Sequence, residues 1–338
     1  MFVELHLIQN FAPSNLNRDD TSNPKDCEFG GARRARISSQ CIKRAIRLHP
    51  TFAEVTRVSP GKRSKRLLEQ LQSRLLAAGR QEADVTAVLA GFVTEFLSKL
   101  DGNTGKTAVL LYVADEELDA MGEALLSRWD EISDARRRDA TVKELAKALT
   151  KELRGRTGAP DIALFGRMLA EKPLLNLDAA CQVAHAISTH RVTMEMDFYT
   201  AVDDLNPDDT AGAGMMGFTG FDSACFYRYA KVDWDLLLSN LDGDIDLARR
   251  TVAGFMLASV QAVPTGKQNS FAAQNQPSLL FATVREKGAG WSLANAFDRP
   301  VRPDREGGLV APSVKALDQY WGRLCQVYGR EGIVSEAA

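Results

Sequence analysis

A dense group of positive charges near the N-terminus is the part of this sequence best suited to bind a ligand. Residues 29–53 contain no Asp or Glu, and they carry six basic residues: Arg33, Arg34, Arg36, Lys43, Arg44 and Arg47. The chain of 338 residues has a formal net charge of −2, so the positive charge is concentrated locally in a mildly acidic protein. Cations with no acid among them favour the binding of a polyanion.

The backbone around these cations is also predicted to suit an anion. Gly30 and Gly31 predict a tight turn, because glycine adopts backbone angles that other residues avoid. Ser38 or Ser39 can then cap a helix by accepting a hydrogen bond from a backbone N–H of its first turn. The free N–H groups of that helix N-terminus would act together with the arginines before it. The alternative is that these cations only form the solvated face of an amphipathic helix.

Other side chains with chemical potential are less well placed. The pairs Asp19-Asp20, Asp203-Asp204 and Asp208-Asp209 could bind a metal, but adjacent side chains point apart, so no pair is a preformed two-oxygen clamp. His185 and His190 are five residues apart with no cysteine at ligand spacing, so we interpret His185 as a residue on a helix face. We therefore predict neither a metal site nor a cofactor.

Composition places the chain among ordinary soluble proteins. Hydrophobic residues make up 45% of the sequence and charged residues 25%, which is enough for one large or two modest domains. No apolar run approaches the roughly 20 residues of a membrane span, and the N-terminus resembles a strand more than a signal peptide. The five cysteines form no CxxC pair, which favours a reducing cytosol and a cytoplasmic location.

The first half of the chain predicts one strand followed by helices. Residues 2–9 alternate between apolar side chains such as Leu5 and polar ones such as His6, which is typical of a half-buried strand. Residues 63–155 carry four apolar stripes at helical spacing, which indicate helices that face a core. A short strand is expected between them, within residues 107–113.

The second half predicts a mixture of strands and helices. Its expected strands are residues 161–168, 191–199, 224–231 and 278–284, and its expected helices are residues 177–189, 245–263 and 312–328. Residues 203–220 are rich in Asp and Gly and predict a flexible excursion, and a later polar loop carries Lys267 and Gln268. This order suits an α+β fold of the ferredoxin-like or RNA-recognition type with long insertions.

The basic segment also carries a specific motif. It consists of Leu16-Asn17-Arg18-Asp19-Asp20, Lys25-Asp26, Phe29-Gly30-Gly31, Arg33-Arg34, Arg36-Ile37-Ser38-Ser39-Gln40 and Lys43-Arg44-Ala45. In this order the segment resembles the N-terminus of the CasC family, which forms the backbone of the type I-E CRISPR complex Cascade. Ala32 stands where some members of that family carry another basic residue.

The resemblance continues through most of the chain. Its further motifs are Asp161-Ile162-Ala163-Leu164, Gly166-Arg167-Met168, Ala184-His185-Ala186-Ile187, Phe198-Tyr199-Thr200-Ala201-Val202-Asp203-Asp204-Leu205, Phe226-Tyr227-Arg228-Tyr229-Ala230, Lys267-Gln268, Ala294-Asn295-Ala296-Phe297 and Gln319-Tyr320-Trp321. It implies an α+β fold in which residues 1–50 and 156–338 form an RNA-recognition-like (ferredoxin-like) palm. A protruding β-hairpin thumb would lie at roughly residues 161–225, and residues 51–155 would form a helical fingers insertion.

The resemblance implies a non-catalytic subunit that binds CRISPR guide RNA (crRNA) in several head-to-tail copies. It would present the spacer for pairing with a target DNA strand, and it would assemble with capping, large and small Cascade subunits and with no membrane. The implied RNA-binding residues are Asn17, Arg18, Lys25, Arg33, Arg34, Arg36, Ser38, Ser39, Gln40, Lys43, Arg44, Arg47, Met168, Phe198, Tyr199, Thr200, Lys267 and Gln268.

Two other functions stay open at this point. In the related type III effectors, an aspartate in a similar loop of the backbone subunit cleaves bound target RNA with a divalent metal. That activity would draw on Asp19, Asp20 or Asp26. The other alternative is a free-standing single-strand RNA-binding protein, which would not line up along RNA as a filament.

Overall fold

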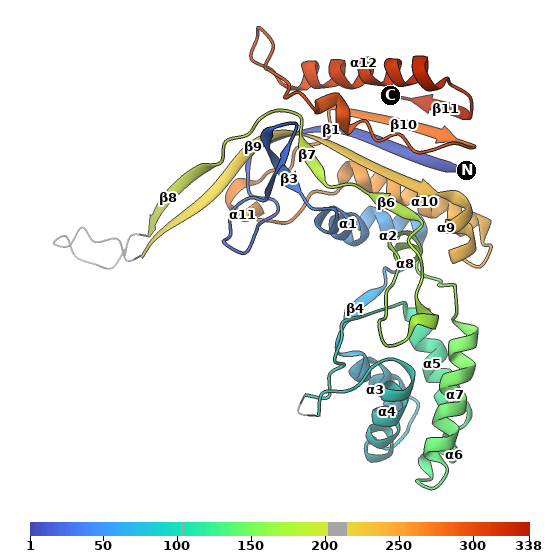
Figure 1. Cartoon of the computed structure of the whole chain (residues 1–338). Helices are drawn as coiled ribbons and strands as arrows, with labels where there is room; N and C mark the ends of the chain where they lie inside the picture. Colours follow the sequence, from blue (N-terminus) through green and yellow to red (C-terminus); the bar gives the residue numbers. More distant parts are fainter. Residues whose placement is uncertain (103, 202–214) are drawn as a thin grey trace, which may run out of the picture. The chain divides into compact units, whose positions relative to one another are not determined.

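A computed structural model describes residues 1–102, 104–201 and 215–338 of the chain. The chain forms two compact units (Figure 1). The sheet unit comprises Met1–His49, Val183–Lys231 and Phe255–Ala338, and the helical unit comprises Pro50–Gln182 and Val232–Gly254. The sequence-based division placed residues 156–182 and 232–254 with the palm, whereas their contacts group them with the helices.

A large sheet organises the sheet unit. Its strands are β1 (Phe2–Ser14), β2 (Asp26–Phe29), β3 (Ala32–Ile37), β6 (Cys181–Val183), β7 (Ala186–Ser188), β8 (Glu195–Ala201), β9 (Met215–Asp233), β10 (Leu279–Arg285) and β11 (Ile333–Ala337). The strand order is β11-β10-β1-β9-β7-β3-β2, and both β6 and β8 also pair with β9. The ladders of β10 with β1 and β11, of β3 with β2 and β7, and of β9 with β7 and β8 are antiparallel.

The N-terminal strand is buried on both of its faces, and not on one as predicted. Leu5 and Leu7 are buried on one face, while Glu4 and His6, on the other, are completely buried. The Glu4 carboxylate accepts hydrogen bonds from the Tyr229 hydroxyl at 2.6 Å and from the Trp291 backbone N–H at 2.7 Å. These donors satisfy the buried Glu4 carboxylate, whereas the alternating pattern predicts that water would do so.

Helices cover the sheet in this unit. They are α1 (Ser39–Leu48), the short α11 (Gln268–Phe271), the 3-10 turn η2 (Ala294–Phe297) and α12 (Val310–Tyr328). The core under α12 joins Ile8 of β1 and Phe281 of β10 to Leu317 and Trp321 of the helix. The α12 helix lies along the sheet (Figure 1), so the predicted closing helix is confirmed.

The helical unit is built from short elements around its own apolar core. They are α2 (Pro50–Thr56), β4 (Lys62–Ser64), α3 (Leu67–Ala77), α4 (Glu82–Phe96), β5 (Leu111–Val113), α5 (Asp115–Ser127), α6 (Trp129–Ser133), α7 (Arg138–Glu152), α8 (Pro160–Phe165), η1 (Pro173–Leu175) and α9 (Trp234–Asn240), and α10 (Ile245–Gln261) divides between the units at Gly254. The predicted apolar stripes of this region meet in one core, including Leu71, Val88, Leu118 and Leu145.

Two predicted elements of the second half are wrong. Residues 161–168 were expected as a strand but begin in α8, because Pro160 starts a helix well and all six of its residues are buried, which leaves no periodicity to read. Residues 177–189 were expected as a helix but contain β6 and β7, because this segment pairs with β9 and β3. Pairing with neighbouring strands overrides a local helical pattern.

A long hairpin projects from the sheet (Figure 1). Its strands are β8 and the first part of β9, paired from Glu195 with Phe221 to Ala201 with Met215. The strand expected at residues 191–199 begins four residues later and ends two residues later than expected. Residues 215–220 of the expected excursion belong to β9, and residues 202–214 lie outside the described residues.

The predicted fold class is confirmed: the chain has an α+β fold with an antiparallel sheet, a helical insertion and a protruding hairpin. Among the described residues, no helix is both long enough and apolar enough to span a membrane.

Candidate nucleic-acid interface

A rigid loop of residues 15–25 carries the first predicted binding residues. The buried Asn15 amide donates to the backbone oxygen of Ser22 at 3.0 Å and to that of Gly220, at the base of the hairpin, at 2.8 Å. The Asp19 carboxylate accepts from the backbone N–H groups of Thr21 at 2.9 Å and Asn23 at 3.0 Å. A hydrogen bond from the Thr21 hydroxyl is the main cause that holds the pKa of Asp19 below its usual value. Asp19 therefore stabilises the loop.

This loop is fastened to the start of α1. The Asn17 side-chain oxygen accepts from the Ser38 backbone N–H at 2.8 Å, and the Ser38 hydroxyl accepts from the Cys41 N–H at 3.3 Å. Of the two predicted caps, Ser38 and Ser39, it is therefore Ser38 that caps α1. The Lys25 backbone N–H donates to the Asn17 backbone oxygen, and the Arg36 backbone N–H donates to the Lys25 backbone oxygen, both at 2.9 Å. These bonds gather Lys25, Arg36 and the helix N-terminus in one place.

His185 lies at the centre of this group, although the sequence had placed it on a helix. Its Nδ1 accepts the Ser39 backbone N–H at 3.0 Å and faces Arg36 Nη1 at 3.4 Å. Nδ1 is therefore unprotonated, and the neutral ring carries its proton on Nε2. Partial burial, followed by the charges of Arg36 and Lys25, lowers the pKa of His185. Its role depends on contacts with residues about 146 positions away, so the spacing of residues in one sequence gave no signal for it.

Titration of His185 gives a direct test of this cluster. We expect Arg36→Ala to raise the pKa of His185 toward 6.5, because one of the charges that disfavours the protonated ring is removed. Imidazole signals followed by NMR against pH measure this shift. His190 is the internal control, since its pKa is lowered by burial and by Arg34 and does not depend on Arg36. An unchanged His185 pKa would contradict the placement of the ring beside Arg36.

The predicted cations fall into two classes. Arg18 and Arg44 are exposed, Lys25, Arg36 and Lys43 are half-buried, and Arg33 is exposed but paired with Asp26 at 2.6 Å. Arg47 is largely buried, and Arg34 is completely buried. The expectation that Arg34 is a surface cation is therefore wrong.

Arg34 instead connects backbone segments. Its guanidinium donates to the backbone oxygens of Phe29, Ser188, Phe297 and Asp298, at distances from 2.7 to 3.2 Å. A buried cation needs partners for its donors, and these four carbonyls accept hydrogen bonds from four of the five N–H groups of the guanidinium. Arg34 therefore holds the β2–β3 turn, β7 and the segment after η2 together.

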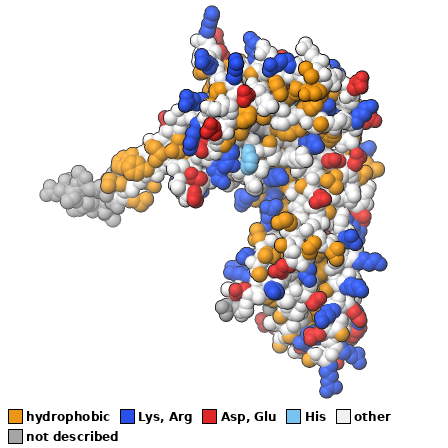
Figure 2. Space-filling model, in the orientation of Figure 1, with side chains coloured by type: hydrophobic (Ala, Val, Ile, Leu, Met, Phe, Trp, Pro, Cys, Tyr) orange, Lys and Arg blue, Asp and Glu red, His pale blue; other side chains and the backbone are white. Residues whose placement is uncertain are grey.

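The hairpin presents apolar side chains to solvent. Phe198 and Tyr199 are 51% and 41% exposed, and Phe218 and Met216 across the ladder are 69% and 68% exposed. The rings of Phe198 and Phe218 lie with their centroids 5.1 Å apart. Figure 2 shows the hairpin as a largely hydrophobic projection, and no Lys or Arg occurs between Arg191 and Arg228. Thr200, also predicted, lies on the same exposed strand β8.

The base of the hairpin packs directly on the loop of residues 15–25. A Cβ on Gly220 would lie 2.6 Å from the Asn23 side-chain oxygen and 3.2 Å from Pro24. A Cβ on Gly266 would lie 2.3 Å from the Leu16 backbone oxygen, so the loop that carries Lys267 also packs against the loop of residues 15–25. The structure therefore places the basic loop, the start of α1, Lys267 and the hairpin base in one neighbourhood of the sheet unit.

Two other predicted residues have different surroundings. The Gln268 amide donates to the backbone oxygens of Pro264 at 3.0 Å and Ala273 at 3.3 Å, so it shapes its own loop. Met168 belongs to the helical unit, where it is 83% exposed.

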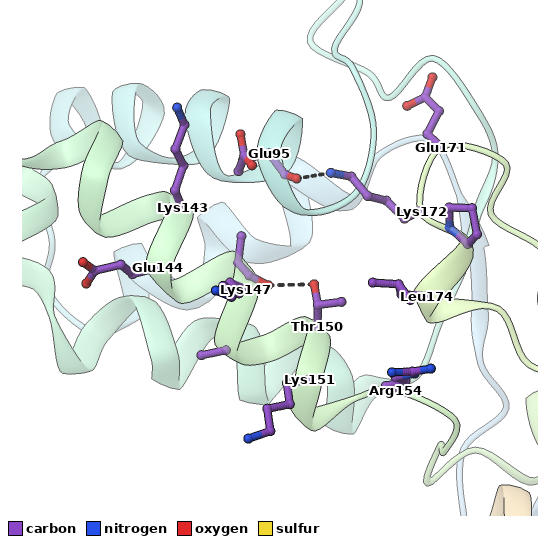
Figure 3. A pocket seen from close by; sticks show the side chains of 13 residues that line it. Glu95, Lys143, Glu144, Lys147, Thr150, Lys151, Arg154, Glu171, Lys172 and Leu174 are labelled. Carbon is purple, nitrogen blue, oxygen red and sulfur yellow. Dashed lines mark hydrogen bonds between the residues drawn. The ribbon is translucent and has the colours of Figure 1, made fainter.

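The helical unit contains a separate hollow of about 770 Å³ beside α7 (Figure 3). Lys143, Lys147 and Lys151 lie along it, and the Lys172 ammonium on its far side donates to the backbone oxygen of Glu95. Glu95, Glu144 and Glu171 also line it. Because both signs of charge meet there, the hollow does not single out one class of ligand.

Among the described residues, no group of three or more His, Cys, Asp or Glu residues is arranged to hold an ion. Asp19 and Asp26 already serve the loop and Arg33, as shown by their hydrogen bonds.

The chain is similar to known proteins over nearly its full length. The family profile described as CT1975-like protein matches residues 3–338. A solved chain of a "CRISPR RNA-guided surveillance complex, pre-nicking" is 34% identical with a TM-score of 0.83, and the match covers 97% of this chain and 89% of that chain. A chain of another "CRISPR RNA-guided surveillance complex" is 29% identical with a TM-score of 0.59, and the match covers 97% and 85%. No curated protein sequence matches.

Proposed function

This chain belongs to the CT1975-like protein family, and from that premise we propose that it is a non-catalytic backbone subunit of a type I-E CRISPR surveillance complex. In this role it binds crRNA and presents the spacer to a target DNA strand. The similarity to chains of two CRISPR RNA-guided surveillance complexes supports the role.

One observation carries the proposal most directly. The basic loop, the capped N-terminus of α1 and the base of an exposed aromatic hairpin are fastened together, through Asn15, Asn17 and Gly220. Lys25, Arg36 and Arg44 supply charge for phosphates, and the helix N-terminus supplies N–H groups. Phe198, Tyr199 and Phe218 offer ring faces on which bases can stack, at about 1–3 kcal/mol for each base.

Such a surface reads the shape and charge of RNA and not its sequence. Contacts to phosphates fix the register of a strand but carry no sequence information. A subunit of this kind accepts any spacer and leaves recognition to base pairing, which is the logic of RNA-guided effectors.

Several copies stack head to tail along one guide in the proposed complex. Heterologous contacts between identical subunits continue as an open filament unless another protein ends it. Capping subunits are therefore partners of this chain, together with the large and small subunits of the complex.

Two of the three candidate aspartates, Asp19 and Asp26, support a scaffold role over a nuclease role. Asp19 is hydrogen-bonded within its own loop, and Asp26 accepts Arg33 Nε at 2.6 Å. A metal-dependent nuclease would need these carboxylates to turn toward an ion and give up bonds that hold the loop.

The decisive experiment is co-expression with the other subunits and a repeat–spacer array. We expect a multi-copy assembly that contains intact guide RNA, as measured by mass and by the ratio of absorbance at two wavelengths. Complementary RNA added with magnesium should stay uncut. Regular magnesium-dependent cuts that disappear when Asp19, Asp20 or Asp26 is replaced by Asn would establish the nuclease instead. A monomer free of nucleic acid, despite the array, would overturn the proposal.

A further inference from the structure

A basic hollow lies in the sheet unit, with a volume of about 840 Å³. One wall is the turn between β2 and β3, formed by Gly30, Gly31 and Ala32, and the other carries Arg191, Arg299 and Arg302. Its remaining lining residues are His190, Pro300, Val301, Pro303 and Leu309, so no carboxylate lines it among the described residues. This distinguishes it from the mixed-charge hollow beside α7.

Hydrogen bonds connect the backbone segments that carry the three arginines. The buried Arg34 donates to Ser188 of β7 and to Phe297, which precedes the 299–303 segment. The Val301 backbone N–H donates to the Thr189 oxygen at 2.9 Å, and the Val192 N–H donates to the Arg33 oxygen at 3.0 Å. Backbone hydrogen bonds next to Arg191 and Arg302, and the Arg34 bonds to Phe297 and Asp298 before Arg299, therefore hold these segments, while the guanidinium groups lie at the surface.

The side chains of these three arginines are available to a ligand. Arg191, Arg299 and Arg302 are all exposed, and within the described ranges no hydrogen bond or ion pair engages their side chains. His190 adds no charge, because Nε2 accepts the Cys225 N–H at 3.2 Å and Nδ1 lies 2.9 Å from the Arg191 oxygen. Burial also lowers the pKa of His190. Three like charges around one hollow repel each other unless an anion lies between them.

The shape of the hollow suits a large anion. On the wall formed by the β2–β3 turn, a Cβ on Gly31 would meet no atom within 4 Å, whereas a Cβ on Gly30 would lie 1.8 Å from the Asp298 backbone oxygen and 3.1 Å from its carboxylate. A bulky ligand can therefore approach the backbone closely at Gly31. Arginine presents a planar fork of donors that matches phosphate, often through two parallel hydrogen bonds.

We propose that this arginine hollow binds the phosphodiester backbone of DNA, at a site separate from the guide-RNA surface around α1. The choice of nucleic acid over an acidic peptide rests on the proposed function. The residues that line the hollow do not include Lys25, Arg36, Arg44 or the first turn of α1, which we assign to the guide RNA.

The test replaces Arg191, Arg299 and Arg302 together by Ala and measures binding of fluorescent DNA by anisotropy. Random-sequence single strands and duplexes form separate arms, which identifies the preferred form. The titrations cover about 50 to 200 mM salt. At about 50 mM salt we expect the triple variant to bind DNA at least about tenfold more weakly than the unchanged chain does. The slope of log affinity against log salt should be shallower by about 2 for single strands or about 3 for duplexes, as expected for three lost phosphate contacts.

A matched control removes three charges from another part of the same unit, through Lys287→Ala, Lys315→Ala and Arg323→Ala. It should bind DNA like the unchanged chain, and both variants should melt at the unchanged temperature and load the same amount of RNA. Wild-type DNA affinity in the arginine variant, or equal losses in both variants, would overturn the proposal. Unchanged DNA binding with a smaller assembly would assign the hollow to an acidic segment of a neighbouring subunit.

Failure of this proposal is distinguishable from failure of the proposed function. The guide-loading measurement concerns RNA that co-purifies, and the anisotropy measurement uses added DNA. If no RNA co-purifies, the same DNA titrations on the RNA-free chain still decide whether the arginine hollow binds a phosphodiester backbone.

Discussion

Replacing Arg18, Lys25 and Arg44 together by Ala should yield protein that purifies almost free of RNA. These side chains are exposed or half-exposed, and within the described part of the chain no ion pair or hydrogen bond occupies them. If each subunit neutralises about five phosphates, log affinity should fall with log salt at a slope of about −3.5, by the rule for single strands. Removing three cations should leave a slope of about −1.4 and an affinity about a hundredfold lower.

Two guides with unrelated spacers extend this test. Both should lose affinity equally, because the lost contacts are to phosphates. The Lys287, Lys315 and Arg323 variant, with the same change in net charge, should keep its RNA. Selective loss of one guide would show that the surface reads bases, and a slope unchanged by the triple substitution would remove the electrostatic argument.

Arg34→Met should destabilise the sheet unit without touching the exposed charges. The substitution removes the donor from four carbonyls, of which those of Ser188 and Phe297 are buried and those of Phe29 and Asp298 are partly buried, although it also removes the cost of burying a charge. We expect a net loss of about 3 kcal/mol in the free energy of unfolding, because hydrogen bonds to charged groups contribute about 1.5–3 kcal/mol each and part is offset. Denaturant unfolding followed by tryptophan fluorescence measures this change.

Arg33→Met is the matched control, since Arg33 is adjacent in sequence and its side chain is 69% exposed. Its pair with Asp26 lies at the surface, where ion pairs contribute about 0–1 kcal/mol, so its stability should change little. If Arg34→Met unfolds like the unchanged chain but loses RNA, then Arg34 contacts phosphate and the structural role assigned to it is wrong.

Local features of the basic segment could be predicted from sequence because they depend on near neighbours. Gly30 and Gly31 do adopt positive φ angles of 58° and 66° at the turn, and Ser38 does cap α1. These outcomes follow from the conformational freedom of glycine and from a hydroxyl three residues before the N–H that it accepts.

Features that depend on distant partners could not be predicted in this way. Arg33 and Arg34 are the same residue type at adjacent positions, so the sequence alone does not separate them. Their positions in β3 leave Arg33 exposed and Arg34 buried, where it donates to the Phe297 and Asp298 backbone oxygens. The helix expected at residues 177–189 failed for the same reason, because its pairing partners on β9 and β3 override a local pattern. His185 was misplaced together with that segment.

The pairing of β1 with β10 has a consequence for how the chain folds. Phe2 lies opposite Arg285 and Ile8 opposite Leu279, so the first strand made finds this neighbour only after more than 270 further residues have been synthesised. Contacts of such sequence separation close slowly, whereas the helices of residues 50–182 can form locally as they leave the ribosome. The helical unit is therefore expected to be complete while the sheet still lacks β10 and β11. During that interval a nascent chain exposes the long edge of β1, which makes translation the period in which this protein is most vulnerable to aggregation.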